Sequence, residues 1–136
     1  MLTDTTCTYV IEEPFDRALR RLKKVLASSN LKISGELNIS ARIQAELMIS
    51  LPPCVLLFAS APEMVQENIA LDEYDAAMMP LHLVISARGP RTEVHFLKAV
   101  PRSAGLLQSR AFEAARSLQL ALSRVLERIG RLQVDA

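Results

Sequence analysis

The segment from Pro52 to Leu97 constrains the fold more than any other part of this chain. It contains an apolar run from Cys54 to Ala59, a predicted helix that Ser60 would cap, and two alternating runs joined by a short turn. An apolar run between helix breakers is typical of a strand covered on both faces, and alternation is typical of a hairpin. The segment therefore predicts a central strand, a helix toward Ile69 and a hairpin, but it contains no motif of a known reaction.

Two amphipathic helices are predicted on either side of this segment. The first begins at Phe15 and runs to about Leu26, and the second runs from about Leu107 to Ile129, where Gly130 is a natural terminator. In both, apolar side chains recur at intervals of three and four residues. Each helix therefore has one face for the core and one for solvent.

Three shorter elements complete the prediction. The pattern favours a strand over Thr8–Glu12 and an extended segment over Leu31–Leu37, in which Gly35 marks a bulge or bend. Ser40 can cap a short helix that runs to Glu46.

Composition limits the class of protein. The 136 residues fit one domain, residues 1–136 with a core of about 8–130, and the formal net charge of +1 gives no field that would attract nucleic acid. No apolar stretch approaches the roughly 20 residues of a membrane span, and the amino terminus lacks a signal sequence. We expect a cytoplasmic protein without a membrane partner or a cofactor, in which Cys7 and Cys54 form no disulfide.

The hairpin has a predicted register. Its strands Leu81–Ala87 and Arg91–Lys98 flank the turn Arg88-Gly89-Pro90, and pairing Leu81 with Phe96 places the apolar side chains together on one face.

This register sets His82 directly opposite His95, with Glu93 diagonal to the pair. Cross-strand neighbours lie about 5 Å apart at Cβ, close enough for two imidazoles to share a metal. A complete site needs a third ligand, and Glu93 is the nearby candidate. Ordinary sheet histidines at an interface are the more frequent arrangement, so we expect no metal and keep His82 and His95 as weak candidates.

The order of the elements resembles the domain-of-unknown-function 302 family of bacteria and archaea across nearly the whole chain. The residues that carry the resemblance are Tyr9-Val10, Phe15-Asp16-Arg17-Ala18, Leu31-Lys32-Ile33, Glu36-Leu37-Asn38-Ile39, Val55-Leu56-Leu57-Phe58 with Pro62, and Met79-Pro80 before Leu83-Val84-Ile85. The resemblance implies an α+β fold: a two-layer α/β sandwich of the TATA-box-binding-protein-like group, with a mostly antiparallel sheet and helices on one face. It implies no activity, and DNA binding does not follow from the fold.

Family members often carry two cysteines that this chain lacks. The matching positions are Ser60, two residues before Pro62, and Leu81, directly after Pro80. The resemblance therefore gives no support to thiol or metal chemistry at that pair.

A single layer of helices leaves one face of the sheet open, whereas the apolar run at Cys54–Ala59 favours cover on both faces. We therefore expect a non-enzymatic domain that forms a homodimer or binds a small apolar ligand. The residues expected at the interface or ligand site are His82, Val84, Glu93, His95 and Leu97.

Two other functions stay open. One is a metal-dependent or thiol enzyme that uses His82 and His95, with Cys54 as the candidate thiol. The other is nucleic-acid binding through the basic helix face from Arg17 to Lys24, which lacks the interleaved aromatic residues of a single-strand platform. Such a basic face is more often the solvent side of an amphipathic helix.

Overall fold

The computed structural model describes residues 6–60, 81–97 and 110–133, with the backbone alone over 110–115. Within these residues six strands form one antiparallel sheet in the order β2-β3-β4-β5-β1-β6. The strands are β1 (Thr6–Ile11), β2 (Lys32–Asn38), β3 (Cys54–Ser60), β4 (Leu81–Arg88), β5 (Arg91–Leu97) and β6 (Arg131–Leu132). The helices are α1 (Phe15–Ser28), α2 (Ile39–Leu47) and α5 (Arg110–Ile129).

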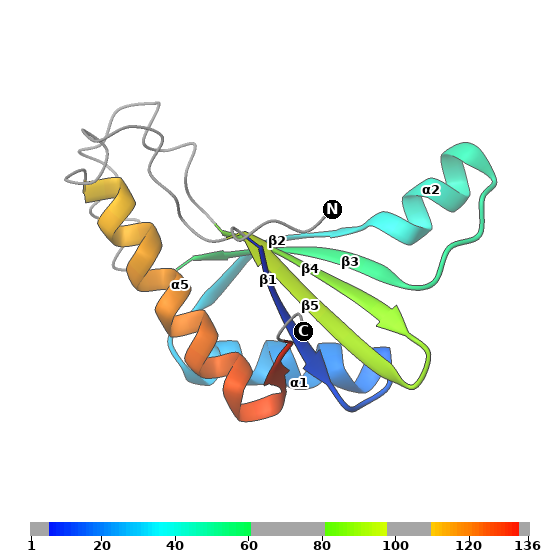
Figure 1. Ribbon diagram of the computed structural model, residues 1–136. Coiled ribbons are helices and arrows are strands. Elements are labelled where there is room, and N and C mark those ends of the chain that lie inside the picture. Colours follow the sequence, from blue (N-terminus) through cyan, green and yellow to red (C-terminus); the bar gives the residue numbers. More distant parts are fainter. Residues whose placement is uncertain (1–5, 61–80, 98–109, 134–136) are drawn as a thin grey trace.

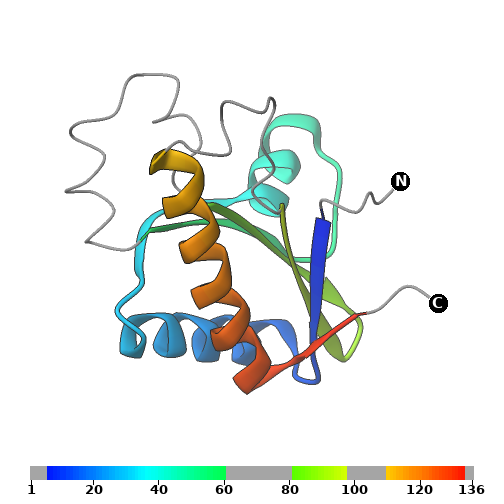
Figure 2. The same cartoon turned by 60° about the vertical axis from the view of Figure 1, so that its left-hand side comes forward.

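Helices α1 and α5 pack on the same face of the sheet, and α5 runs across the direction of α1 (Figures 1 and 2). Their inward side chains have the spacing that the sequence predicted: Ala18, Leu22 and Leu26 of α1, and Leu118, Leu122, Val125, Leu126 and Ile129 of α5 are buried. Each fully buried leucine contributes about 1.5–3 kcal/mol relative to its exposed state. The two-layer α+β architecture is therefore confirmed.

Strand β3 lies inside the sheet between β2 and β4, but its two faces differ. Val55, Leu57 and Ala59 are buried against the helices, whereas Leu56 and Phe58 on the opposite side are only half-buried. The apolar run is thus covered fully on one face.

The bulge expected at Gly35 is present, because the pairing of β2 with β3 shifts between Ile33 and Gly35. The expected cap of the short helix is wrong by two residues. Asn38 caps α2, since its Oδ1 accepts the N–H of Ala41 at 2.9 Å. The hydroxyl of Ser40 instead accepts the N–H of Cys54 at 3.1 Å and so ties the start of α2 to the start of β3.

The predicted hairpin register is wrong by two residues. The structure pairs Arg88 with Arg91 and Val84 with His95, so the turn is Gly89-Pro90. Gly89 has φ +61°, and proline holds φ near about −65°, a combination that fits a type II′ turn. The predicted register would close the turn with the N–H of Pro90, which proline does not have.

Strand β6 was not predicted. It follows Gly130 directly and pairs with β1 through Tyr9–Leu132 and Val10–Arg131. The helix expected from Ser60 toward Ile69 lies outside the described residues, except that Ser60 itself ends β3.

Candidate functional site

The sheet face opposite α1 and α5 brings the predicted site residues together, and we name it the open face. Its side chains are Thr6, Thr8 and Val10 of β1, Glu93, His95 and Leu97 of β5, His82, Val84 and Ser86 of β4, Cys54, Leu56 and Phe58 of β3, and Leu37 of β2. All five residues expected at an interface or ligand site, His82, Val84, Glu93, His95 and Leu97, lie on this face.

The two histidines are not directly opposite each other. His95 pairs with Val84, and His82 lies two residues farther along β4, so the histidines are diagonal neighbours. Diagonal neighbours are about 7–8 Å apart, still within reach of long side chains, but here the two rings have different partners. The exposed His82 ring instead contacts Phe58 edge to face, with centroids 5.0 Å apart and planes at 88°.

His95 belongs to a hydrogen-bonded group at the centre of the open face. Its Nδ1 lies 3.0 Å from Oγ1 of Thr8, and its Nε2 lies 3.5 Å from both Oγ of Ser86 and Oε1 of Glu93. An ionised carboxylate only accepts hydrogen bonds, so Glu93 favours the tautomer that carries its proton on Nε2. In that tautomer the Thr8 hydroxyl donates to Nδ1.

The order hydroxyl, imidazole, carboxylate resembles a hydrolase triad, but access argues against that use. Thr8 and Ser86 are each 7% exposed, so neither hydroxyl is open to a substrate. Burial lowers the pKa of His95, and the positive charge of Arg88 lowers it further, against an opposing effect of Glu93. A neutral, satisfied His95 is suited to linking β1, β4 and β5.

Cys54 is the one cysteine on the open face, opposite Ser86 in the register, whereas Cys7 is buried on the helix-covered face. Because they lie on opposite faces of the sheet, the two cysteines cannot bond to each other. Burial raises the pKa of the Cys54 thiol, and the charge of Arg88 opposes the shift only in part. A nucleophilic thiol needs the reverse shift. The geometry therefore does not favour the thiol-enzyme hypothesis.

Metal ligation finds no support in the described parts of the chain, where no group of three or more His, Cys, Asp or Glu side chains could hold an ion. His82 and His95 with Glu93 do not form such a group: the His82 ring lies against Phe58, whereas His95 contacts Thr8, Ser86 and Glu93.

The basic face of α1 is partly neutralised by neighbouring acids. Arg21 forms an ion pair with Glu13, and Lys23 Nζ lies 2.7 Å from Oε1 of Glu36 on β2. Arg17 and Lys24 are exposed. This arrangement is typical of a solvated helix face with two surface ion pairs, and less typical of a surface that binds a nucleic-acid backbone.

Helix α2 and the residues after it form an apolar projection, which we name the α2 arm (residues 39–51). The arm extends from the end of β2 away from α1 and α5 (Figure 1), and no residue of the helix is buried. Its apolar tip consists of Leu47, Met48, Ile49 and Leu51, which are 63%, 80%, 49% and 43% exposed. Contiguous exposed apolar residues of this kind mark interaction surfaces. The short helix predicted from Ser40 to Glu46 gave no indication of this exposed tip.

Thr8 and Arg131 at the open face were not predicted from the sequence, whereas the alternation of β4 places Ser86 on the same face as His82. Thr8 meets His95 across 87 positions of sequence, and Arg131 meets Glu12 across 119. The alternation of β4 gives a local signal for Ser86, but Arg131 reaches the face only through the pairing of β6 with β1.

Comparison with known proteins identifies the family. The family model described as "Domain of unknown function DUF302" matches residues 7–129. The chain belongs to the DUF302 family. The crystal structure of an uncharacterized conserved DUF302 protein from Bacillus stearothermophilus matches this fold with a TM-score of 0.78, at 16% sequence identity, over 93% of this chain and 99% of that chain.

At this identity the similarity to the Bacillus DUF302 protein shows the fold alone. A search among curated proteins finds no match. Among the helices that the structure describes, none combines the length and apolar character needed to cross a membrane. The function of this DUF302 chain therefore has to be argued from its own surface.

Proposed function

We propose that this chain is a single-domain, non-enzymatic cytoplasmic protein that self-associates, with the open face of one copy covered by a second copy. The observation that carries the proposal is the apolar character of this face. Leu56, Phe58 and Val84 are only half-buried there, and Leu97 is 66% exposed. Covering such side chains is favourable by about 25 cal/mol per Å² of apolar area removed from water.

The α2 arm is the second reason to choose another copy of the chain as the occupant. The arm presents Leu47, Met48, Ile49 and Leu51 to solvent at one end of the sheet, while the described helices α1 and α5 both lie on the face opposite the open face. In a two-fold dimer each copy would supply one surface to the other and receive the same in return. The exchange would bury both apolar surfaces at once.

Charge is compatible with this partner. The net charge of +1 produces little repulsion between two copies, and the arrangement of an apolar centre with a polar rim is typical of protein interfaces. A nucleic acid would require a basic surface. Here Glu93 pairs with Arg88 and Glu36 pairs with Lys23, so each of these positive charges is neutralised.

Sedimentation equilibrium tests the proposal with three variants. Leu97→Glu changes the open face, Met48→Glu changes the tip of the α2 arm, and Leu120→Glu on α5 is the control because Leu120 is 52% exposed on the helix layer. We expect wild type and Leu120→Glu to show twice the chain mass of 15.1 kDa. A charge placed in a desolvated contact weakens association by about 100-fold, so Leu97→Glu and Met48→Glu should sediment as monomers.

A wild-type monomer at about 100 μM would overturn the proposal, since a stable dimer needs a dissociation constant below this concentration. Native mass spectrometry of the same sample tests a small apolar ligand as the alternative occupant of the open face. A monomer that carries an extra mass, lost on denaturation and in Leu97→Glu, would replace self-association by ligand binding.

A further inference from the structure

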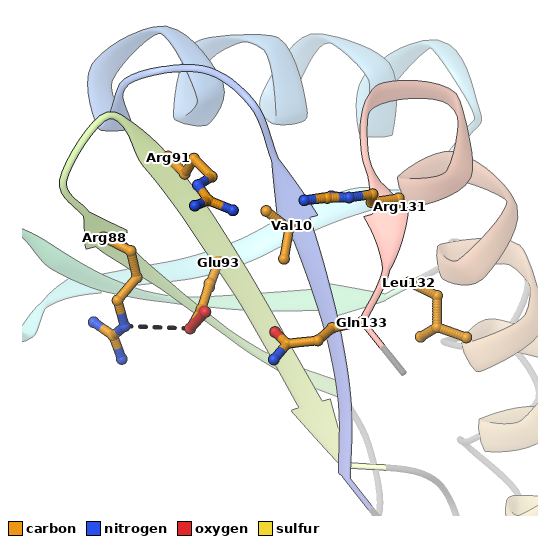
Figure 3. A pocket seen from close by; sticks show the side chains of 7 residues that line it. All are labelled: Val10, Arg88, Arg91, Glu93, Arg131, Leu132 and Gln133. Carbon is orange, nitrogen blue, oxygen red and sulfur yellow. Dashed lines mark ion pairs between the residues drawn. The ribbon is translucent and has the colours of Figure 1, made fainter. Parts of the chain in front are cut away.

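A pocket of about 470 Å³ lies where the β4–β5 turn meets β1 and β6. Its wall is formed by Val10, Arg88, Arg91, Glu93, Arg131, Leu132 and Gln133 (Figure 3). The volume is within the range of about 300–1,000 Å³ for small-molecule sites. Glu93 and Leu97 are separated by four positions of β5, or about 13 Å, so the pocket is distant from the exposed end of the open face.

Three arginines line this pocket. Arg88 ends β4, Arg91 begins β5 and Arg131 begins β6. Figure 3 shows Arg91 and Arg131 extending toward each other across Val10, with Gln133 on the Glu93 side of the pocket. Three positive charges at one pocket would repel each other without a bound anion or acidic neighbours.

Two acidic side chains hold these arginines in place. Glu12 accepts a hydrogen bond from Arg131 Nη2 at 2.7 Å, and its other oxygen lies 3.8 Å from Nε of Arg91. Glu93 lies 3.2 Å from Nε of Arg88. The two carboxylates therefore orient three cations and leave one positive charge in excess.

The arginines keep donors for a further acceptor. Each guanidinium has five N–H groups. The contacts of the described residues engage Nε and Nη1 of Arg88 and Nη2 of Arg131. Planar guanidinium groups make bidentate contacts with carboxylates and phosphates, and a phosphate monoester can accept from two arginines at once because it has three free oxygens.

We infer that this pocket binds a phosphate monoester, with the phosphate between Arg91 and Arg131 and its organic group against Val10 and Leu132. Leu132 is 48% exposed, so an apolar group placed there removes it from water. A pocket that joins charged donors to apolar wall residues fits an organic phosphate better than inorganic phosphate. All of the wall residues belong to a single copy, so the monomeric variant Leu97→Glu tests phosphate binding separately from self-association.

Isothermal titration calorimetry in phosphate-free buffer at fixed ionic strength tests the inference, with phenyl phosphate and inorganic phosphate as probes. We expect saturable one-to-one binding of phenyl phosphate with a dissociation constant of about 1 mM or lower, and weaker binding of inorganic phosphate. Loss of a charge-assisted contact weakens binding by about tenfold or more, which is the expected effect of Arg91→Gln and of Arg131→Gln.

Two further variants separate a built site from bulk charge. Arg42→Gln removes a cation from the α2 arm, where Arg42 pairs with Glu46. This variant should leave the dissociation constant of phenyl phosphate unchanged. Glu12→Gln releases Arg91 and Arg131 and removes a negative charge, so phenyl phosphate should bind several-fold more tightly. Since Glu12, Arg91 and Arg131 are each more than half exposed, these substitutions leave the core intact, and circular dichroism checks this.

Several results would overturn the inference. They are an absence of saturation up to about 20 mM phenyl phosphate, an equal loss of binding in Arg42→Gln and Arg131→Gln, or weaker binding in Glu12→Gln. Weaker binding in Glu12→Gln would mean that Arg91 and Arg131 bind the Glu12 carboxylate in place of an external anion.

Discussion

Replacing Gly130 by alanine should destabilise this protein because of a close approach of two backbones. Gly130 ends α5, and its N–H donates to the carbonyl of Leu126 at 2.8 Å. A Cβ at this position would lie 2.6 Å from the carbonyl oxygen of Val10 and 3.1 Å from Cγ1 of Ile11. Gly130 has no positive φ, so the need for glycine comes from contact and not from conformation.

The expected loss of stability follows from the distance by which the two backbones would have to move apart. Ordinary contacts of Cβ begin at 3.4 Å, so Gly130 and Val10 would have to separate by about 0.8 Å. The hydrogen bond from the N–H of Gln133 to the carbonyl of Thr8, now 2.8 Å, would then approach or exceed the limit for such bonds. Losing one or two hydrogen bonds and straining the helix end costs about 2–3 kcal/mol, and the stiffer alanine backbone returns about 0.5–1 kcal/mol.

Urea denaturation followed by circular dichroism measures the effect. We expect the free energy of unfolding of Gly130→Ala to fall by about 2 kcal/mol, with a loss of about 5–8 °C in melting temperature. Gly89→Ala is the matched control, because Gly89 has φ +61° and nothing within 4 Å of its Cβ position, so its cost is conformational, about 1–2 kcal/mol.

The two variants differ at the arginine pocket. Gly130→Ala should also displace β6 and weaken phenyl phosphate binding through Arg131, whereas Gly89→Ala changes the turn between Arg88 and Arg91 and leaves β6 in place. A Gly130→Ala protein as stable as wild type would refute the steric reasoning.

Three further predictions concern other parts of the fold. The pKa of His95 is below its ordinary value of about 6.5, so the unfolded chain binds the proton more readily than the folded one. The free energy of unfolding therefore falls as the pH drops through 6.5 toward the lowered pKa. Urea titrations from about pH 8 to 5.5 should show a smaller change of this free energy with pH for His95→Gln than for wild type. Leu22→Ala removes a side chain with 0% exposure and should cost about 2–5 kcal/mol in the same denaturation assay, and a cost below 1 kcal/mol would contradict the packing described. Asn38→Ala removes the cap of α2 and should cost about 1 kcal/mol locally, visible as faster amide exchange in residues 39–47 with little change in global stability, because α2 buries no residue.

The helices that cover the sheet were predictable from the sequence, because the spacing of apolar residues within each helix indicates both the helix and its buried face. Leu22 and Leu26 fall on one face of α1 by helical spacing, and the same faces are buried in the structure. The bulge at Gly35 was also predicted from the residue itself.

The hairpin register was predictable in principle but was predicted wrongly. The signal was Pro90, whose missing N–H excludes the turn of Arg88-Gly89 and requires Gly89-Pro90. Alternation alone cannot decide between two registers that differ by two residues, because both keep the same side chains on the same face.

The α2 arm shows a limit of a different kind. Ile43 and Leu47 have helical spacing, but α2 contacts the sheet only near its start, where Ile43 is half-buried, and Leu47 stays exposed. Periodicity indicates which side of a helix is apolar and does not indicate whether another element covers that side.

By itself the sequence determined the two long helices, the apolar strands and the family, since propensity and periodicity act over a few residues. Only the tertiary structure decided which distant side chains meet. The pairing of β1 with β5 brings Thr8 to His95, and the pairing of β1 with β6 brings Arg131 to Glu12 and Arg91. These contacts depend on strand order, which is set by the burial of the whole sheet against α1 and α5 and leaves no trace in local spacing.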